Sequence, residues 1–284
     1  MPLNSSSLRG ALWMGGAVLC FSVMAVSARE LLRHMGTFEV LFMRTAISFL
    51  VLLAFLPRIG IAALRTRCFD LQVWRNLAHF CGLAAWVYAI GALPLAAVFA
   101  IEFTFPVWTA ILATLFLGEH LKRHRLVMLV LGLAGVLIIL RPGFGVLHPA
   151  SLVMLLGSLC FAIQMTFLKR IAATDSPYAV LFWMSVLQTP LSLALAAPDW
   201  VAPGASDWLW IVFIGFSNFA ANYCLTRALR LADATVVVPI DFFRLPLIAV
   251  VGAVFYNEPF DPAVMAGAAL IFAGTYYSIS RDKM

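Results

Sequence analysis

The sequence predicts an all-α integral membrane protein with ten transmembrane helices, arranged as two inverted repeats of five helices. Composition is the first reason: 63% of the 284 residues are hydrophobic, only 11% are charged, and the mean hydropathy is +0.99. A soluble domain of this length could not bury so much apolar surface. The second reason is that apolar stretches of about 20 residues, the length that crosses a bilayer as a helix, recur along the whole chain. The third is that its two halves resemble each other.

The apolar stretches define ten expected helices, separated by loops so short that little chain is left for a soluble domain. They lie at 10–29, 37–56, 73–93, 95–117, 125–141, 150–169, 177–197, 207–228, 234–256 and 262–280.

The internal similarity divides the chain in the middle. The segment LWMGGAVLCFS, which begins at Leu12, resembles LVMLLGSLCFA, which begins at Leu152. At a spacing of 139 residues, Ile-Glu-Phe at 101–103 recurs as Ile-Asp-Phe at 240–242. We therefore expect residues 1–145 and 146–284 to form two five-helix repeats of one unit. Because five is odd, the second repeat enters the membrane from the opposite side, an architecture typical of alternating-access transporters.

The basic residues predict the orientation, because Lys and Arg accumulate in cytoplasmic loops. With the N-terminus inside, fourteen basic residues fall on the cytoplasmic side and three on the other. The fourteen are Arg9, Arg58, Arg65, Arg67, Arg75, Lys122, Arg123, Arg125, Lys169, Arg170, Arg227, Arg230, Arg281 and Lys283, and the three are Arg29, Arg33 and Arg141. Both termini are thus expected in the cytoplasm. The net charge of +6 is then explained by topology and by contact with anionic lipid, without a nucleic-acid partner.

Several classes of function are disfavoured. Four of the five cysteines lie in expected helices and the fifth, Cys68, in a basic loop, so we expect neither disulfides nor a metal site. The chain contains no nucleotide-binding loop, HExxH or GxSxG pattern, so neither an enzyme nor an ATP-driven pump is expected, and no cofactor is implied.

Four charged residues stand out because they lie well inside expected helices, away from the helix ends: Arg44, Glu102, Asp241 and Arg244. A charge near the centre of a bilayer costs several kcal/mol unless it faces a cavity or a partner. Glu102 lies about 7 residues from the outer end of its helix and Asp241 about 7 from the inner end, so each is roughly 10 Å deep, from opposite surfaces. An inverted repeat would place both carboxylates around one central cavity.

Two prolines strengthen this expectation. A proline inside a helix removes a backbone hydrogen bond and frees the carbonyl four residues earlier. Pro106 would free the carbonyl of Glu102, and Pro246 that of Phe242, beside Asp241. Interrupted backbone beside buried charge is a common way to build a solute site.

Two interpretations of the charges stay open. Asp241 and Arg244 are three residues apart on one helical face, so they either neutralise each other structurally or line a transport path, which we favour. Glu102 has no basic neighbour on its own helix, so its partner is another helix, a solute or a proton. Proton uptake by Glu102 would couple transport to the proton gradient.

Aromatic and amide residues inside the expected helices are further candidates for a solute site. They are Trp86, Tyr88, Asn222 and Tyr223, and more weakly His79 and Gln164. For each, the alternative is ordinary packing, because buried aromatic residues usually belong to the core and buried amides often link helices.

These features together resemble the EamA-type group of the drug/metabolite transporter superfamily. The pieces that carry the resemblance are FEVLFMR (38–44), AWVYAIGALPLAAVFAIEFTFPVWTAIL (85–112), FLGEHLKRHRLVMLVLGLAGVLIILRPG (116–143) and TRALRLADATVVVPIDFFRLP (226–246). The resemblance implies two inverted five-helix repeats, a central cavity, alternating access and a bacterial inner membrane. It also implies a site or gating role for Arg44. Met184 stands at the matching place of the second half, so that role is not repeated symmetrically.

We therefore expect a secondary transporter of a small polar or zwitterionic, amino-acid-like metabolite, acting as an exporter, with protons as a candidate coupling ion. Arg44 or Arg244 would bind the carboxylate of the solute, and Glu102 or Asp241 its amine. The alternatives are an uptake or exchange carrier for a larger cofactor-like metabolite, with aromatic stacking surfaces, and a lipid-handling or helper membrane subunit.

Overall fold

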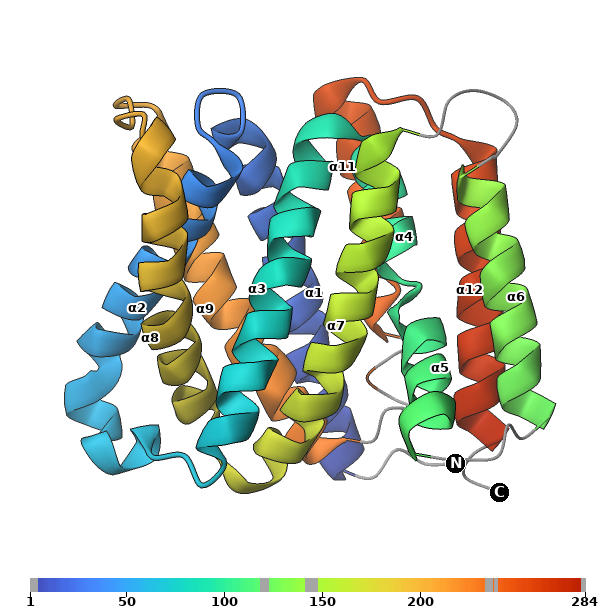
Figure 1. Cartoon of the computed structure of the whole chain (residues 1–284), viewed down its shortest axis with the longest axis horizontal. Coiled ribbons are helices and arrows are strands. Elements are labelled where there is room, and N and C mark those ends of the chain that lie inside the picture. The colour runs from blue at the N-terminus through green and yellow to red at the C-terminus, as the bar shows by residue number, and fades with distance from the viewer. Residues whose placement is uncertain (1–4, 118–122, 141–147, 233–236, 238–239, 282–284) are drawn as a thin grey trace.

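The computed structural model describes residues 5–117, 123–140, 148–232, 237 and 240–281, and in these residues the regular structure is entirely helical (Figure 1). The first half contains α1 (Ser5–Leu31), α2 (Thr37–Ile59), the short 3-10 helix η1 (Ile61–Leu64), α3 (Phe69–Ala92), α4 (Leu95–Glu102), α5 (Phe105–Leu117) and α6 (Arg123–Leu140). The second half contains α7 (Pro149–Thr174), α8 (Pro177–Ala196), the 3-10 turn η2 (Ala197–Asp199), α9 (Asp207–Leu231), α11 (Arg244–Tyr256) and α12 (Pro262–Arg281).

Each expected stretch contains a helix, but the stretches 95–117 and 234–256 are each interrupted. The stretch 95–117 is two helices, because α4 ends at Glu102 and α5 begins at Phe105. The expected helices 125–141 and 234–256 run partly outside the described residues, as do Lys122, Arg141 and Lys283.

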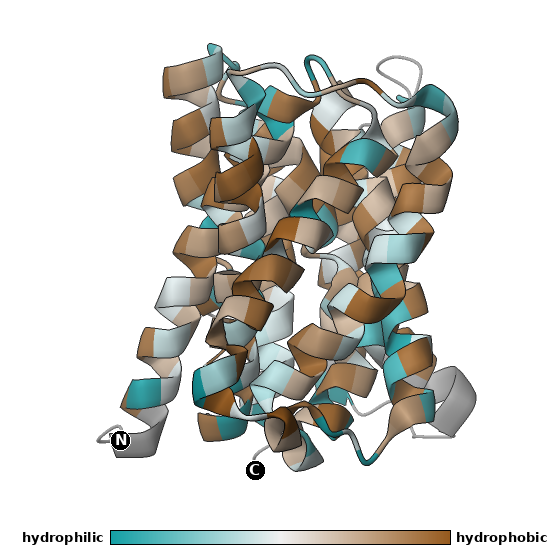
Figure 2. Cartoon of the chain, turned by 90° about the vertical axis from the view of Figure 1, so that its left-hand side faces the viewer, coloured by the Kyte–Doolittle hydropathy of each residue, from teal (hydrophilic) through white to brown (hydrophobic). Residues whose placement is uncertain are grey.

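The helices have the character of a multi-pass membrane protein. Within the described part of the chain, five helices are long and apolar enough to cross a membrane, and shorter apolar helices accompany them. The five are Leu8–Leu31, Thr37–Ile59, Pro149–Thr174, Pro177–Asp199 and Asp207–Leu231. In Figure 2, apolar residues (brown) occur along the length of the helices seen from this side. Large apolar side chains such as Leu12, Leu133 and Phe255 are exposed, as expected for contact with lipid.

The packing relates the two halves. Helix α1 packs along α9 and α3 packs along α7, α2 packs on α8, and α6 packs on α12 at one edge of the bundle (Figure 1). By chain order, α1, α2, α3 and α6 of the first half correspond to α7, α8, α9 and α12 of the second half. Replacing each helix by its counterpart turns the α1–α9 pair into the α7–α3 pair. It leaves the α2–α8 and α6–α12 pairs unchanged. A duplicated chain with a twofold relation between its halves packs in this way.

One basic residue lies elsewhere than its expected place. Arg75, counted above among the cytoplasmic residues, lies in the second turn of α3, and its side chain is buried. Its guanidinium donates to the side-chain oxygen of Asn76 at 3.0 Å. Within the bundle, an amide side chain takes the place of water at this arginine.

The α6–α12 contact depends on two glycines that face each other. A Cβ atom on Gly135 would lie 2.5 Å from the carbonyl oxygen of Gly267, and one on Gly267 would lie 2.6 Å from the carbonyl oxygen of Gly135. Both values are well below van der Waals distance, and in each case the obstacle is backbone. The two helices therefore approach as closely as they do only because both positions lack a side chain.

Gly135→Ala should lower the thermal stability of the purified protein in detergent, by the equivalent of about 1–3 kcal/mol typical of overpacking. Gly15→Ala is the matched control, because a Cβ atom there meets nothing within 4 Å. Equal melting temperatures for the two variants would contradict this account of the α6–α12 contact.

Candidate functional site

Two helix interruptions lie at the centre of the bundle. After α4 ends at Glu102, the amide of Thr104 bonds back to the carbonyl of Ile101 at 3.1 Å, a three-residue spacing that ends the α-helical pattern. Before α11, the amide of Phe243 bonds to the carbonyl of Ile240 at 3.1 Å in the same way. Each carboxylate expected to be functional therefore lies at an interruption.

The two prolines fit this backbone. Pro106 is the second residue of α5 and Pro246 the third residue of α11. In the first turn of a helix the missing N–H has no intrahelical partner to lose, so proline is tolerated there. The expected disruption beside the two acids is thus present, and the prolines begin the helices that follow it.

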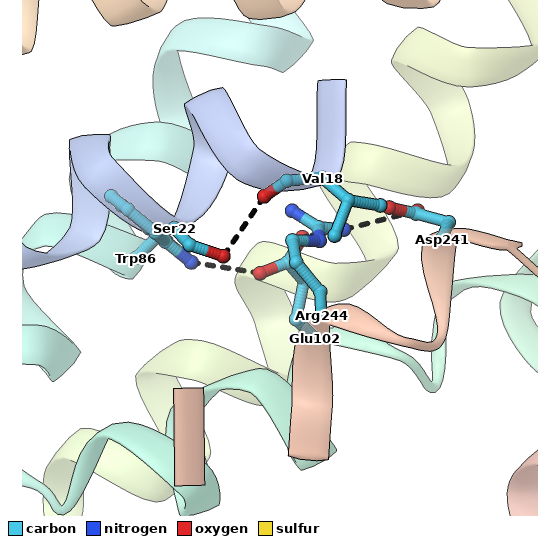
Figure 3. Close-up of polar contacts among 6 residues, drawn as sticks. All are labelled: Val18, Ser22, Trp86, Glu102, Asp241 and Arg244. Carbon is cyan, nitrogen blue, oxygen red and sulfur yellow. Dashed lines mark hydrogen bonds and ion pairs between the residues drawn. The ribbon is translucent and has the colours of Figure 1, made fainter. Parts of the chain in front are cut away.

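The guanidinium of Arg244 bridges the two carboxylates (Figure 3). Its Nη2 atom lies 3.1 Å from Oε1 of Glu102 and 3.0 Å from Oδ2 of Asp241. The indole N–H of Trp86 donates to the other oxygen of Glu102 at 2.8 Å. All four side chains are buried. Removal of the arginine would leave two buried carboxylates without a cation, and removal of both carboxylates would leave the arginine without an anion. Either change is costly in a medium of low dielectric constant.

Aromatic rings enclose the arginine. The guanidinium carbon of Arg244 lies 4.7, 5.3 and 5.1 Å from the ring centroids of Phe21, Phe99 and Phe103. Phe103 also stacks on Phe242, with centroids 4.2 Å apart. Phe103 directly follows Glu102, and Phe242 directly follows Asp241. The two helix interruptions are therefore in contact through these stacked rings. Cation–π contacts of this kind hold a buried guanidinium in place without neutralising it.

A cavity of about 60 Å³ lies between these groups, with room for a few water molecules. Its walls combine both signs of charge with amide and aromatic surface. The lining residues are Phe21, Met24, Arg44, His79, Leu83, Trp86, Glu102, Phe105, Phe161, Gln164, Met165, Asn222, Leu225, Asp241 and Arg244.

Six of the eight principal candidates from the sequence line this cavity, as do His79 and Gln164. The other two do not. Tyr88 lies on the outer side of α3 and is 45% exposed. Tyr223 packs against Trp13 and against Tyr178, whose hydroxyl lies 3.4 Å from its own. Asp241 and Arg244 form an ion pair and also line the cavity, so both interpretations of the pair stay open.

A second polar cluster surrounds Arg44. Its Nη1 donates to Oδ1 of Asn218 at 2.6 Å and its Nη2 to Oε1 of Gln188 at 3.4 Å. The amide of Gln188 in turn donates to the backbone and side-chain oxygens of Asn76, both at 3.2 Å, and lies 2.9 Å from Nδ1 of His79. Sequence reasoning missed Gln188 and Asn76. Gln188 lies in the middle of an apolar helix, and an intramembrane amide of that kind was the available indication.

The fold and the cavity define a helical membrane protein with a charged cavity at its centre. A family model described as the EamA-like transporter family matches residues 8–141 and again 148–280. The chain therefore belongs to the EamA-like transporter family, whose members are transporters rather than enzymes.

Individual relatives match over nearly the full length. A riboflavin transporter of Rhizobium johnstonii is 32% identical over 99% of this chain and 93% of its own. An S-adenosylmethionine uptake transporter of Rickettsia prowazekii is 28% identical over 97% and 94%, and a pseudopaline exporter of Pseudomonas aeruginosa is 26% identical over 94% of each chain. A crystal structure with 20% identity matches 97% of this chain and 99% of its own with a TM-score of 0.69, which shows the shared fold.

Arg244→Ala should strongly destabilise the protein, because Glu102 and Asp241 would then remain buried without their cation. Loss of one partner from a buried ion pair costs about 3–5 kcal/mol. The measurement is thermal unfolding in detergent, and the control is the triple variant Glu102→Gln, Asp241→Asn, Arg244→Gln, which removes every charge of the cluster and should regain most of the stability. A stable Arg244→Ala variant would show that the bridge is not needed for folding.

Proposed function

We propose that this chain is a secondary transporter that carries a small polar metabolite with both a carboxylate and an amine, by alternating access through the central cavity. The observation that carries the proposal is that buried charges of both signs line one cavity where two interrupted helices meet. Such midplane sites between helix repeats are the usual solute sites of secondary transporters.

The proposal includes ten membrane-spanning helices in two inverted repeats, residues 1–145 and 146–284, in the inner membrane. The double match of the family model and the exchange of helix pairs support two repeats. Cytoplasmic termini are supported by the basic residues, which number thirteen against three once the buried Arg75 is left out.

The Arg244 bridge suggests how solute binding and movement are linked. Arg244 and Asp241 belong to the second half, whereas Glu102 belongs to the first, so the 3.1 Å contact between Arg244 and Glu102 ties the halves together. An amine of the solute, or a proton, that binds the Glu102 carboxylate weakens this tie. The halves are then free to rearrange, which is the step that alternating access requires.

A second candidate, a carrier for uptake or exchange of a larger cofactor-like metabolite, is favoured by a separate observation. Relatives are named for S-adenosylmethionine uptake and for riboflavin transport. Both molecules contain aromatic rings, and the rings of Phe21, Trp86 and Phe161 line the cavity. A solute of that size would require the cavity to widen well beyond its present volume.

The direct test reconstitutes the purified protein in liposomes loaded with a mixed metabolite pool that includes amino acids, S-adenosylmethionine and riboflavin. Mass spectrometry of both compartments, with and without a pH gradient, should show protein-dependent passage of one amino-acid-like class. Passage of the cofactors alone would favour the second candidate. Movement of nothing, from either side of the membrane, would contradict transport by the isolated chain.

Glu102→Gln should abolish or uncouple this transport with little loss of folded protein, because the amide retains the shape but loses the charge that Arg244, an amine or a proton binds. The same liposome assay measures the rate, and Asp70→Asn, the same chemical change at an exposed position on α3, should transport normally. Wild-type, gradient-dependent transport by Glu102→Gln would exclude a coupling role for this carboxylate.

A further inference from the structure

Two arginines near one end of the cavity are buried. Arg44, on α2, and Arg75, on α3, are each 1% exposed. Across the described ranges neither guanidinium has a carboxylate within salt-bridge distance. Glu102 and Asp241, the carboxylates that line the cavity, both bind Arg244 instead.

Among the residues that the structure describes, only neutral groups accept hydrogen bonds from the two guanidinium groups. Arg44 donates to the amides of Asn218 and Gln188, and Arg75 to that of Asn76. Polar atoms are left over: the Nε atoms of both arginines and the Nδ2 atom of Asn218 are buried and find no acceptor among the residues that the structure describes. Buried cations with spare donors are costly unless a partner binds them.

The pair is placed to act on the contents of the cavity. Arg44, His79 and Asn222 line it. Arg75 joins the same polar network, because it donates to Asn76, which accepts from the Gln188 side chain that contacts Arg44 and His79. Two arginines and two carboxylates line the cavity, and Arg75 belongs to the network beside it, which gives an excess of one positive charge when all five are ionised. Protonation of Glu102, Asp241 or His79 increases that excess.

We infer that the Arg44 end of the cavity is an oxyanion subsite, in which Arg44 binds a carboxylate or phosphate group of the solute. Asn218 offers a further donor, and Arg75 acts as a positioning residue that supplies the second positive charge. The inference rests on the proposed transport function and places the oxyanion of the solute beside Arg44 and Arg75. A solute of net charge −1 neutralises the site completely. Arg244 is not the anion-binding residue, because the two carboxylates already occupy it.

The test uses formate, an isolated carboxylate, and formamide, its uncharged analogue of similar size, as probes. Thermal unfolding of the purified protein is measured against the concentration of each probe at constant ionic strength. Formate should raise the melting temperature in a saturable way and formamide should not. The saturable effect should disappear in Arg44→Gln and weaken at least tenfold in apparent affinity in Arg75→Gln. It should be unchanged in Arg58→Gln, which removes an exposed arginine from the same helix as Arg44.

If Arg44→Gln does not fold, Arg44→Lys replaces it; this variant keeps the charge and should bind formate more weakly than the wild type. The subsite is refuted if the wild type shows no saturable formate effect, or if removal of either charge leaves that effect unchanged.

The experiments distinguish failure of the oxyanion subsite from failure of the proposed transport function. Formate binding without transport of any metabolite would remove only the transport function, and transport without formate binding would remove only the oxyanion subsite.

Discussion

The structure depends on one buried arginine that is shared by two carboxylates. Arg244 ties Glu102 of the first half to Asp241 of the second, and both acids lie where a helix is interrupted. Without a cation these two carboxylates would not be stable side by side in an apolar bundle, and without the acids the arginine would not be stable among phenylalanine rings. The interrupted backbone, the stacked Phe103 and Phe242, and the cavity all follow from placing this cluster at the centre.

The sequence predicted this centre because its components are rare in membrane helices. Glu102, Asp241 and Arg244 stand out in apolar stretches, and the prolines just beyond them mark the disturbed backbone. The contact between Arg244 and Glu102 was beyond prediction, since the two residues are 142 positions apart and only the packing of the halves brings them together. The complete interruption at 103–104 was likewise not foreseen, because one proline at the start of a helix does not specify where the preceding helix ends.

Which face of a helix points inward was harder to predict than where the helix lies. In a soluble protein the polar face marks the outside, but lipid is as apolar as a core, so periodicity distinguishes the two sides poorly. Asn222 and Tyr223 are neighbours in the middle of α9, yet only Asn222 lines the cavity. For the same reason the sequence does not show that Tyr88 lies on the exposed side of α3 rather than in the cavity. Arg75 is expected in a cytoplasmic segment, because a charge near a helix end is usually solvated. In the structure it is buried and donates to Asn76, which in turn accepts from Gln188.

The difference between Arg44 and Met184 has a consequence for energetics. Met184 is fully buried and apolar at the position of the second half that corresponds to Arg44. In the proposed cycle the two halves exchange roles between the inward-open and outward-open forms. If both halves carried the same residues, the empty carrier would populate the two forms equally. A charge held by only one half makes their free energies differ, so the empty carrier has a preferred resting form, and that preference contributes to the direction in which the carrier works.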